Sequence, residues 1–348
     1  MKDRERILIF NVNWLGDALF STATIRNIRA NHPDDFIACI IPSRCLAVLE
    51  GNIHLDEIII FDEKGKHKNP WQKLKFISYL RKKRFDKVFL LHRSMSRALL
   101  AWLAGIPERI GYYTSKRGFL LTKPIMAPAV ESMHRIDYYL NIIKEAGLAV
   151  SDRHTEFFVK QEDIQAVEDF LIKNSITEDD FIAGINPGGN WGPKRWPLEN
   201  FAQLADNLAD EFKAKIIITG SEKDVELAEE IRQDMRHGAV LACGKLTLKQ
   251  FAVLANILNI FVSADSGPMH IANAVGARKI FALFGPTDPK LTGPYPQENV
   301  VIVRKNSACQ IPCYKVDCRD NFCMKKITPE DVMAEIRRAF KTQNAKIE

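Results

Sequence analysis

Short apolar runs rich in β-branched residues alternate with longer amphipathic segments along nearly the whole chain, and this alternation constrains the fold most. The runs have the length and composition of buried strands, and the segments between them have helical periodicity. Strands that alternate with helices form βαβ units, whose parallel sheets are covered by helices on both faces. The expected strands are Ile7–Asn11, Phe36–Ile41, Glu57–Phe61, Lys87–Leu91, Ile182–Ile185, Lys215–Thr219, Ile260–Ser263, Lys279–Leu283 and Val300–Val303. The expected helices are Ala18–Asn31, Leu74–Lys83, Asp163–Asn174, Leu198–Phe212, Val225–Arg236 and Thr247–Leu254.

The alternation is interrupted between about Ser151 and Asp180, which divides the chain into two parts. A length of 348 residues suits two domains of ordinary size. We therefore expect an α/β protein with two parallel-sheet domains, 1–165 and 166–348, on either side of a cleft. Asp163 is expected to cap the helix that follows the interruption. The last helix is expected to have Pro329 at its first position and to pack back toward the first domain.

The composition excludes several classes of protein. The chain is 46% hydrophobic and 26% charged, which is ordinary for a globular protein and argues against disorder. A net charge of +6 is too small for a dedicated nucleic-acid binder, so no nucleic-acid partner is expected. The uncharged stretch Phe251–Ala264 is shorter than the about 20 residues of a membrane span, and the N-terminus lacks the apolar core of a secretory signal. We expect a cytoplasmic protein.

One segment departs from the even distribution of charge. Between Lys64 and Arg84 the sequence has nine Lys or Arg and no acidic residue, interleaved with Trp71, Phe76 and Tyr79. The segment is either a solvated helix face or a surface that contacts an anionic membrane or a phosphorylated substrate.

Four of the seven cysteines are close in sequence, with the pattern Cys309-x3-Cys313-x4-Cys318-x4-Cys323. Disulfides are disfavoured in a cytosolic chain, which leaves a metal site or a cluster of reduced thiols. The spacing lacks the Cys-x2-Cys pairs of most zinc sites, so we expect no metal.

The first strand is followed by the turn Val12–Asp17, which opens a helix. Ligands of open α/β sheets bind beyond the carboxyl ends of the strands, so Asp17 occupies a position where chemistry is expected. With a single glycine, the turn does not match the dinucleotide-binding fingerprint. The alternative is that Asp17 only caps the helix.

The second half begins with a strand and then the turn Asn186–Pro197, which contains three glycines. Glycines such as Gly188 allow a backbone to approach a ligand closely, and Lys194 and Arg195 add positive charge. The turn is typical of a phosphate cradle, although it is not a Walker A motif; the alternative is a charged surface turn. Further along, Glu222 follows a strand and Gly220, where an acid can bind ribose hydroxyls or merely cap a helix.

The strongest local motif is Asp265–His270, which lies between a buried strand and a helix. Free N–H groups of Ser266, Gly267 and Met269 and the helix dipole would bind a diphosphate, and Asp265 and His270 add polar side chains. The alternative for His270 is a histidine that only packs. Together with the turn Phe284–Pro289, these strand ends predict a nucleotide-diphosphate pocket that faces Asp17 across the cleft.

These motifs resemble those of the family 9 glycosyltransferases, the bacterial heptosyltransferases, and the resemblance covers nearly the whole chain. The matching segments are Asn13–Asp17 with the helix after it, Asn186–Pro197, Asp265–His270 and the Cys-x2-Pro-Cys segment with its two further cysteines. Arg93–Arg97 and Ala104–Tyr112, together with the cysteines, resemble the branch that adds the second heptose of the lipopolysaccharide inner core.

The resemblance implies a GT-B architecture of two Rossmann-like domains, with the acceptor on the first and ADP-heptose on the second. It implies an inverting transfer in which Asp17 is the general base, Lys194 neutralises the leaving diphosphate and Glu222 faces the adenosine. The implied donor-binding residues are Asn186, Gly188, Lys194, Glu222, Asp265, Ser266, Gly267, Met269 and His270. The implied acceptor-binding residues are Gly16, Arg93 and Arg97.

The implied partners are ADP-heptose, the core and lipid A of lipopolysaccharide, and the anionic inner face of the cytoplasmic membrane. No cofactor or metal is expected to be required, and Mg²⁺ at most stimulates. Three alternatives remain open: a heptosyltransferase that adds the first heptose, an epimerase of nucleotide sugars with the same architecture, and a binding module without turnover that uses Lys64–Arg84 as its interface.

Overall fold

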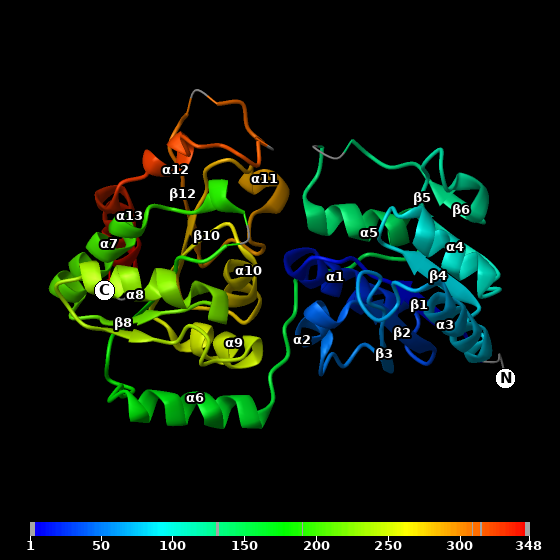
Figure 1. Ribbon diagram of the computed structural model, residues 1–348, viewed down its shortest axis with the longest axis horizontal. Helices are drawn as coiled ribbons and strands as arrows, with labels where there is room; N and C mark the ends of the chain where they lie inside the picture. The colour runs from blue at the N-terminus through cyan, green and yellow to red at the C-terminus, as the bar shows by residue number, and fades with distance from the viewer. Residues whose placement is uncertain (1–3, 130–131, 190, 308, 314, 345–348) are drawn as a thin grey trace. The chain divides into compact units, whose positions relative to one another are not determined.

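The computed structural model describes residues 4–129, 132–189, 191–307, 309–313 and 315–344 (Figure 1). The chain forms two compact units, Met1–Phe158 and Val159–Glu348. This division precedes the expected boundary at 165/166, which would cut helix α6 (Gln161–Lys173). The helix belongs to the second unit because it packs against α9 (Leu248–Ile257).

The first unit contains a six-stranded parallel sheet of order β3-β2-β1-β4-β5-β6. Its strands are β1 (Arg6–Phe10), β2 (Phe36–Ile41), β3 (Glu57–Ile60), β4 (Lys87–Leu90), β5 (Glu108–Tyr112) and β6 (Lys123–Ile125). Its helices are α1 (Leu15–Asn31), α2 (Leu46–Leu49), α3 (Pro70–Lys83), α4 (Met95–Leu103) and α5 (Arg135–Glu145), with the 3-10 turns η1 (Ser43–Cys45) and η2 (Gly118–Leu120).

The second unit repeats the plan with a parallel sheet of order β12-β11-β10-β7-β8-β9. Its strands are β7 (Ile182–Asn186), β8 (Lys215–Ile218), β9 (Ala239–Leu241), β10 (Ile260–Ala264), β11 (Ile280–Leu283) and β12 (Val300–Val303). Besides α6 and α9, its helices are α7 (Leu198–Phe212), α8 (Val225–Asp234), α10 (Gly267–Ala274), α11 (Pro289–Thr292), α12 (Phe322–Lys325) and α13 (Pro329–Asn344), with the 3-10 turns η3 (Gly192–Lys194) and η4 (Glu222–Asp224).

Both sheets have the doubly wound order in which the chain proceeds outward in one direction and then in the other. The direction reverses between β1 and β4 in the first unit and between β7 and β10 in the second. The loops that follow these strands diverge to opposite faces of the sheet, and ligands of such folds bind in the crevice between them. The carboxyl ends of β1, β4, β7 and β10 are therefore the places where a site is expected.

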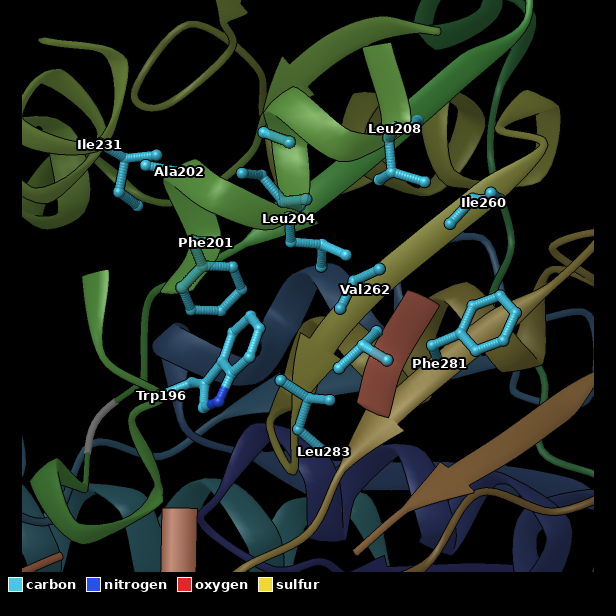
Figure 2. Packing of buried hydrophobic residues seen from close by; sticks show 14 of the residues in the cluster. Trp196, Phe201, Ala202, Leu204, Leu208, Ile231, Ile260, Val262, Phe281 and Leu283 are labelled. Atoms are coloured by element: carbon cyan, nitrogen blue, oxygen red, sulfur yellow. The ribbon is translucent and has the colours of Figure 1, made fainter. Parts of the chain in front are cut away.

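The core of the second unit lies between the sheet and α7, and Trp196 anchors one end of it (Figure 2). Trp196 is 1% exposed and meets the ring of Phe201 edge to face at 4.9 Å. Its indole N–H donates to the carbonyl oxygen of Ile327 at 2.8 Å, so its one polar group is satisfied despite burial. This anchor fixes the end of the loop that follows β7.

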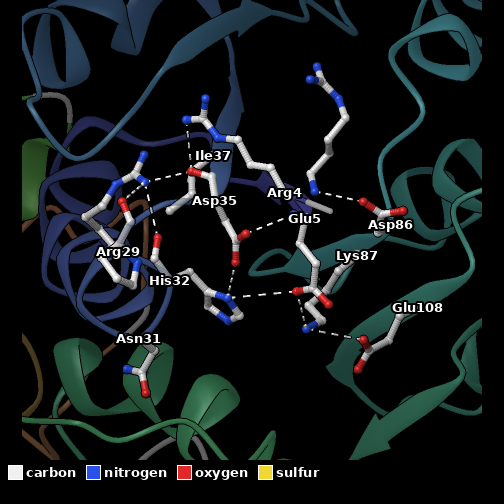
Figure 3. Close-up of polar contacts among 12 residues, drawn as sticks. Arg4, Glu5, Arg29, Asn31, His32, Asp35, Ile37, Asp86, Lys87 and Glu108 are labelled. Atoms are coloured by element: carbon white, nitrogen blue, oxygen red, sulfur yellow. Dashed lines mark hydrogen bonds and ion pairs between the residues drawn. The ribbon is translucent and has the colours of Figure 1, made fainter. Parts of the chain in front are cut away.

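A polar network covers the opposite, amino-terminal edge of the first sheet (Figure 3). The Asp35 carboxylate accepts hydrogen bonds from the backbone N–H of Glu5 at 2.8 Å and from His32 Nδ1 at 2.8 Å. The Lys87 ammonium lies 3.4 Å from a carboxylate oxygen of Glu5. Asp86 accepts from the N–H of Arg6 at 2.8 Å. The network satisfies backbone groups at the strand starts.

Several element boundaries differ from the sequence expectation. Helix α1 begins at Leu15 rather than Ala18, and Asp163 is not the N-cap of α6, since that position is Lys160, whose N–H donates to Asp163. Strands β5, β6 and β9 were not expected. The expected start of α13 at Pro329 is confirmed, and α13 packs on α7 and β12 of its own unit. Among the described residues, no helix is both long and apolar enough to span a membrane.

Candidate functional site

The carboxyl end of β10 carries a buried carboxylate that joins three loops of the second unit. Asp265, which is 6% exposed, directly follows β10. One of its oxygens accepts from Lys194 Nζ at 2.6 Å and from Thr287 Oγ1 at 2.7 Å. The other oxygen lies 3.5 Å from Nε2 of His270 on α10. The loops after β7, β10 and β11 therefore meet at one side chain.

Lys194 and His270 together decide the charge of Asp265. Burial alone would raise the pKa of its carboxyl, but the hydrogen bond from His270 and the charge of Lys194 outweigh burial and hold the pKa below its ordinary value. Asp265 is thus ionised throughout the neutral range. Its charge in turn fixes the ammonium group of Lys194, whose side chain is 23% exposed, at the carboxyl edge of the sheet. A phosphate at this edge would meet an already oriented cation.

The start of α10 supplies backbone donors beside this cation. Ser266 precedes the helix in extended conformation and Gly267 is its first residue. The first N–H groups of a helix have no intrahelical acceptor and point toward any anion at that end. The Met269 side chain is fully buried, so the group that this residue offers is its backbone N–H. Ser263 and Ser266 hydroxyls, 3.1 Å apart, hold the turn.

Asn186 and Gly188 shape the turn after β7. Asn186 is 2% exposed; its oxygen accepts from Thr219 Oγ1 at 3.3 Å, and its amide donates to the Gly188 carbonyl oxygen at 3.4 Å. A Cβ at Gly188 would lie 2.6 Å from the Asp224 carboxyl group. Asp224 itself accepts from the Ser221 hydroxyl at 2.6 Å. The turns after β7 and β8 therefore pack closely, and a side chain at position 188 would have to displace the Asp224 carboxylate from Ser221.

Glu222 lies apart from the Asp265 network, which consists of Asp265 and its partners Lys194, Thr287 and His270. It is exposed at the start of η4, after β8. Its Cα would lie 3.2 Å from a Cβ at Gly244, on the loop that follows β9. The structure thus places Glu222 at the same edge of the sheet as Asp265, on the other side of β7.

In the first unit, Asp17 lies in the first turn of α1, directly after β1. The N-cap position is Trp14, which makes no side-chain cap, so the interpretation of Asp17 as the cap residue is wrong. Its carboxylate instead accepts a hydrogen bond from Tyr139 Oη on α5, at 2.8 Å. Asp17 is partly exposed. Its neighbour Gly16 has no side chain, which keeps the backbone of this turn accessible.

The two arginines that the sequence analysis assigned to the acceptor have different environments. Arg97 is 2% exposed; its guanidinium donates to the Asn11 carbonyl oxygen and to the side chain of Asn13, and it lies 5.0 Å from the Phe10 ring centre. It therefore shapes the turn between β1 and Asp17. Arg93, after β4, is exposed.

Several residues near the carboxyl edge of the first sheet were not foreseen from the sequence. Burial, together with the charges of Arg97 and Arg117, lowers the pKa of His92 to about 4, so this histidine is neutral. The buried Arg117 donates to the His92 carbonyl oxygen at 2.6 Å. Tyr139 and Arg117 belong to no recognisable motif, because each reaches the site from a distant part of the chain.

Two groups of residues have side chains that can bind metals. Among the described residues, Glu5, His32 and Asp35 lie within reach of a common ion, but at the amino-terminal edge of the first sheet, opposite Asp17, where they satisfy each other, Lys87 and the backbone. The second group is the cysteines near the C-terminus, and all seven cysteines of the chain are free thiols. Cys323 is buried beside Gly285, Cys309 is exposed and Cys313 and Cys318 are intermediate.

Comparison with known proteins gives consistent matches. Residues 73–322 match the model of glycosyltransferase family 9 (heptosyltransferase). The chain is 28% identical to lipopolysaccharide heptosyltransferase 2 of Escherichia coli, over 98% of this chain and all of that protein. The crystal structure of a family 9 glycosyl transferase from Veillonella parvula matches with a TM-score of 0.89, 26% identity, and 97% and 98% of the two chains covered. The expected GT-B class of fold is confirmed by this match and by E. coli heptosyltransferase II (TM-score 0.78, 24% identity, 97% and 99% covered).

Proposed function

We propose that this chain, which belongs to glycosyltransferase family 9, transfers heptose from ADP-heptose to the inner core of lipopolysaccharide. The observation that supports this function best is the Asp265 network, in which Lys194 and the start of α10 present positive charge and N–H groups at the switch point of the second sheet. A nucleotide diphosphate has the complementary charge. The E. coli relatives are named for lipopolysaccharide and for ADP-heptose.

In the second unit, the proposed donor site places the diphosphate against Lys194 and the N–H groups of Ser266, Gly267 and Met269. Asn186 and Gly188 would form the wall of this site, His270 and Asp265 would contact the heptose or the diphosphate, and Glu222 would contact the adenosine. These donors stabilise the charge that develops on the leaving ADP, a contribution often worth about 3 kcal/mol per donor. No cofactor is required in this scheme, and Mg²⁺ at most stimulates.

The proposed reaction is a single displacement with inversion. An acceptor hydroxyl oxygen attacks the anomeric carbon of the donor as the bond from that carbon to the diphosphate oxygen breaks. The hydroxyl proton passes to the Asp17 carboxylate, and the electron pair of the broken bond leaves on ADP. The reaction requires that the acceptor held by the first unit reach the donor held by the second.

The proposed acceptor is a heptose of the inner core, as in the relatives that carry the number 2 in their names. The exposed Arg93 beside the Asp17 turn has the charge to bind an anionic group of such an acceptor. Gly16 would leave room for the sugar. Arg97 would act indirectly, because its guanidinium holds the turn between β1 and Asp17.

We also propose that the enzyme works at the cytoplasmic face of the inner membrane and contacts it through the basic segment Lys64–Arg84. On α3, Trp71 is 73% and Leu74 54% exposed, next to the exposed Lys75 and Lys82. Large apolar side chains among lysines are typical of surfaces that contact anionic lipid headgroups. Lys83 is the exception, because it pairs with Glu57 at 2.7 Å.

The donor assignment is tested by ligand-dependent thermal unfolding. A ligand that binds the folded state raises the unfolding midpoint by mass action. ADP should raise it more than UDP or GDP at equal concentration, and Lys194→Ala should abolish most of the rise. A larger rise with UDP than with ADP would overturn the assignment of the nucleotide.

A further inference from the structure

A tyrosine from a distant helix reaches the carboxylate of Asp17. Helix α5 packs against α1, and Tyr139 on α5 donates its hydroxyl to one oxygen of Asp17, Oδ1, at 2.8 Å across 122 positions of sequence. The Tyr139 side chain is 5% exposed. The bond therefore connects a buried phenol to a partly exposed carboxylate, and it limits the rotation of that carboxylate.

The phenol remains a hydrogen-bond donor at every working pH. Burial, followed by the charge of Asp17, raises the pKa of Tyr139 well above its ordinary value. Other charged or titratable groups near this pair are Arg135 and Tyr138 on α5, and Cys45 at the end of η1 with its neighbour Arg44. Burial raises the pKa of Cys45 to about 11, so its thiol stays neutral. Tyr139 is thus the neutral donor to Asp17.

We propose that Tyr139 is a positioning residue for the proton transfer: it engages Oδ1 of Asp17 and thereby holds Oδ2 ready for the acceptor hydroxyl. This inference rests on the proposed role of Asp17 as the base. A base must be aligned with the proton that it takes, and a single rotatable carboxylate gains alignment when one oxygen is fixed.

Neighbouring tyrosines show what a purely structural role looks like. Tyr112 donates to the backbone carbonyl oxygen of Tyr138 at 2.6 Å, which fastens α5 to the sheet. The Tyr138 hydroxyl is buried and has no hydrogen-bond partner among the residues that the structure describes. Tyr138→Phe is therefore a matched control, since it removes the same atom from the same helix without touching Asp17.

The experiment compares Tyr139→Phe, Tyr138→Phe and Asp17→Asn, with rates expressed per ADP-binding site so that loss of folded protein is not counted as loss of catalysis. Tyr139→Phe should lower kcat about tenfold with KM for donor and acceptor unchanged, since it removes a hydrogen bond to a charged group. Tyr138→Phe should match the wild type in kcat and in KM.

The inference is overturned if Tyr139→Phe keeps the wild-type kcat, or if Tyr138→Phe loses as much activity. The Asp17→Asn variant distinguishes a failure of the proposed base from a failure of the positioning role. Normal turnover in Asp17→Asn would contradict the proposed base itself. An inactive Asp17→Asn together with a fully active Tyr139→Phe would contradict only the positioning role.

Discussion

Asp17 and Asp265 both follow strands at the switch points of their sheets, and their surroundings suit different tasks. Asp265 is buried and bound to Lys194 and His270, so taking up a proton would leave the Lys194 ammonium without its counter-charge. Asp17 is partly exposed and receives a hydrogen bond from a neutral phenol. Environments that separate two carboxylates in this way commonly assign one to proton transfer and the other to electrostatic support.

Replacement of Asp17 by asparagine tests the proton-transfer role. Because asparagine keeps the size of the side chain and α1 has no side-chain cap at its start, folding and ADP binding should be unchanged. The kcat should fall at least about 100-fold, as expected when a general base is lost. Thermal unfolding and steady-state kinetics measure the two effects. Retention of more than about a tenth of wild-type kcat, with chemistry rate-limiting, would contradict the role.

Replacement of Asp265 by asparagine tests the electrostatic role. Since the folded-state pKa of Asp265 is lowered, its charge stabilises the fold above the unfolded value of about 3.9, and this contribution is lost as pH falls through and below that value. At neutral pH the variant should be less stable by about 1–3 kcal/mol. Its free energy of unfolding should decline less steeply than that of the wild type between about pH 5 and 2.

Urea unfolding at a series of pH values measures this difference. The exposed Asp320 provides a control, because Asp320→Asn should leave the stability curve unchanged. Parallel curves for wild type and Asp265→Asn would show that the charge of Asp265 does not stabilise the fold.

At the scale of elements, the loops after β7 and β8 limit what the donor site tolerates. A Cβ at Gly188 would meet the Asp224 carboxyl group at 2.6 Å, whereas a Cβ at Gly189 would meet no atom of the described residues within 4 Å, its chain neighbours left aside. Gly188→Ala should therefore displace the turn, destabilise the protein by about 1–3 kcal/mol and weaken ADP binding. Gly189→Ala should be close to neutral. Equal ADP affinity in both variants, measured by calorimetry, would contradict the packing argument.

Exposed lysines of the segment Lys64–Arg84, which includes α3, are the basis of a test of the membrane proposal. Reversal of Lys64, Lys66, Lys75 and Lys82 to Glu should lower binding to vesicles of anionic lipid, because each basic residue near the surface contributes about 1 kcal/mol. Turnover on a short, water-soluble acceptor should be nearly unchanged. The control reverses four other exposed basic residues, Lys144, Lys173, Arg278 and Lys341. Equal loss of vesicle binding in both variants would show that only net charge matters.

The elements and turns that could be predicted from the sequence are those that consecutive residues determine. Nine of the strands follow from continuous apolar runs, and the Asp265 turn was found because strand, polar turn and helix follow each other directly. Strand β5 was missed because it contains Gly111, where a Cβ would lie 3.0 Å from Leu90, and β6 because it contains Pro124 in only three residues. The β9 strand is short and half-buried at the sheet edge.

Contacts between distant residues could not be predicted in the same way. The bond from Tyr139 to Asp17 exists because α5 packs on α1, and no spacing within either helix indicates it. Arg97 was assigned to the acceptor from its motif, yet its guanidinium is buried under the β1 turn. A motif identifies which residues matter near a strand end, while packing decides which side chain faces the ligand and which supports the loop.

At the scale of the whole molecule, each unit has its own sheet and its own strand-end site, and neither site alone accounts for transfer. The second unit has the positive charge and N–H groups of the proposed donor site, and the first has Asp17, the proposed base. The proposed reaction uses both. An epimerase with the same architecture would act on the donor alone, so dependence on an acceptor separates the two functions.

The most direct measurement is transfer of radiolabelled heptose by the purified protein from ADP-heptose to defined lipopolysaccharides. One acceptor should end in the first inner-core heptose, and the matched control should lack it. We expect label to appear on the acceptor with heptose, with inverted anomeric configuration, and no reaction of the donor without acceptor. Transfer to the control alone would identify an enzyme that adds the first heptose. Conversion of the donor with no transfer to either acceptor would contradict the central claim.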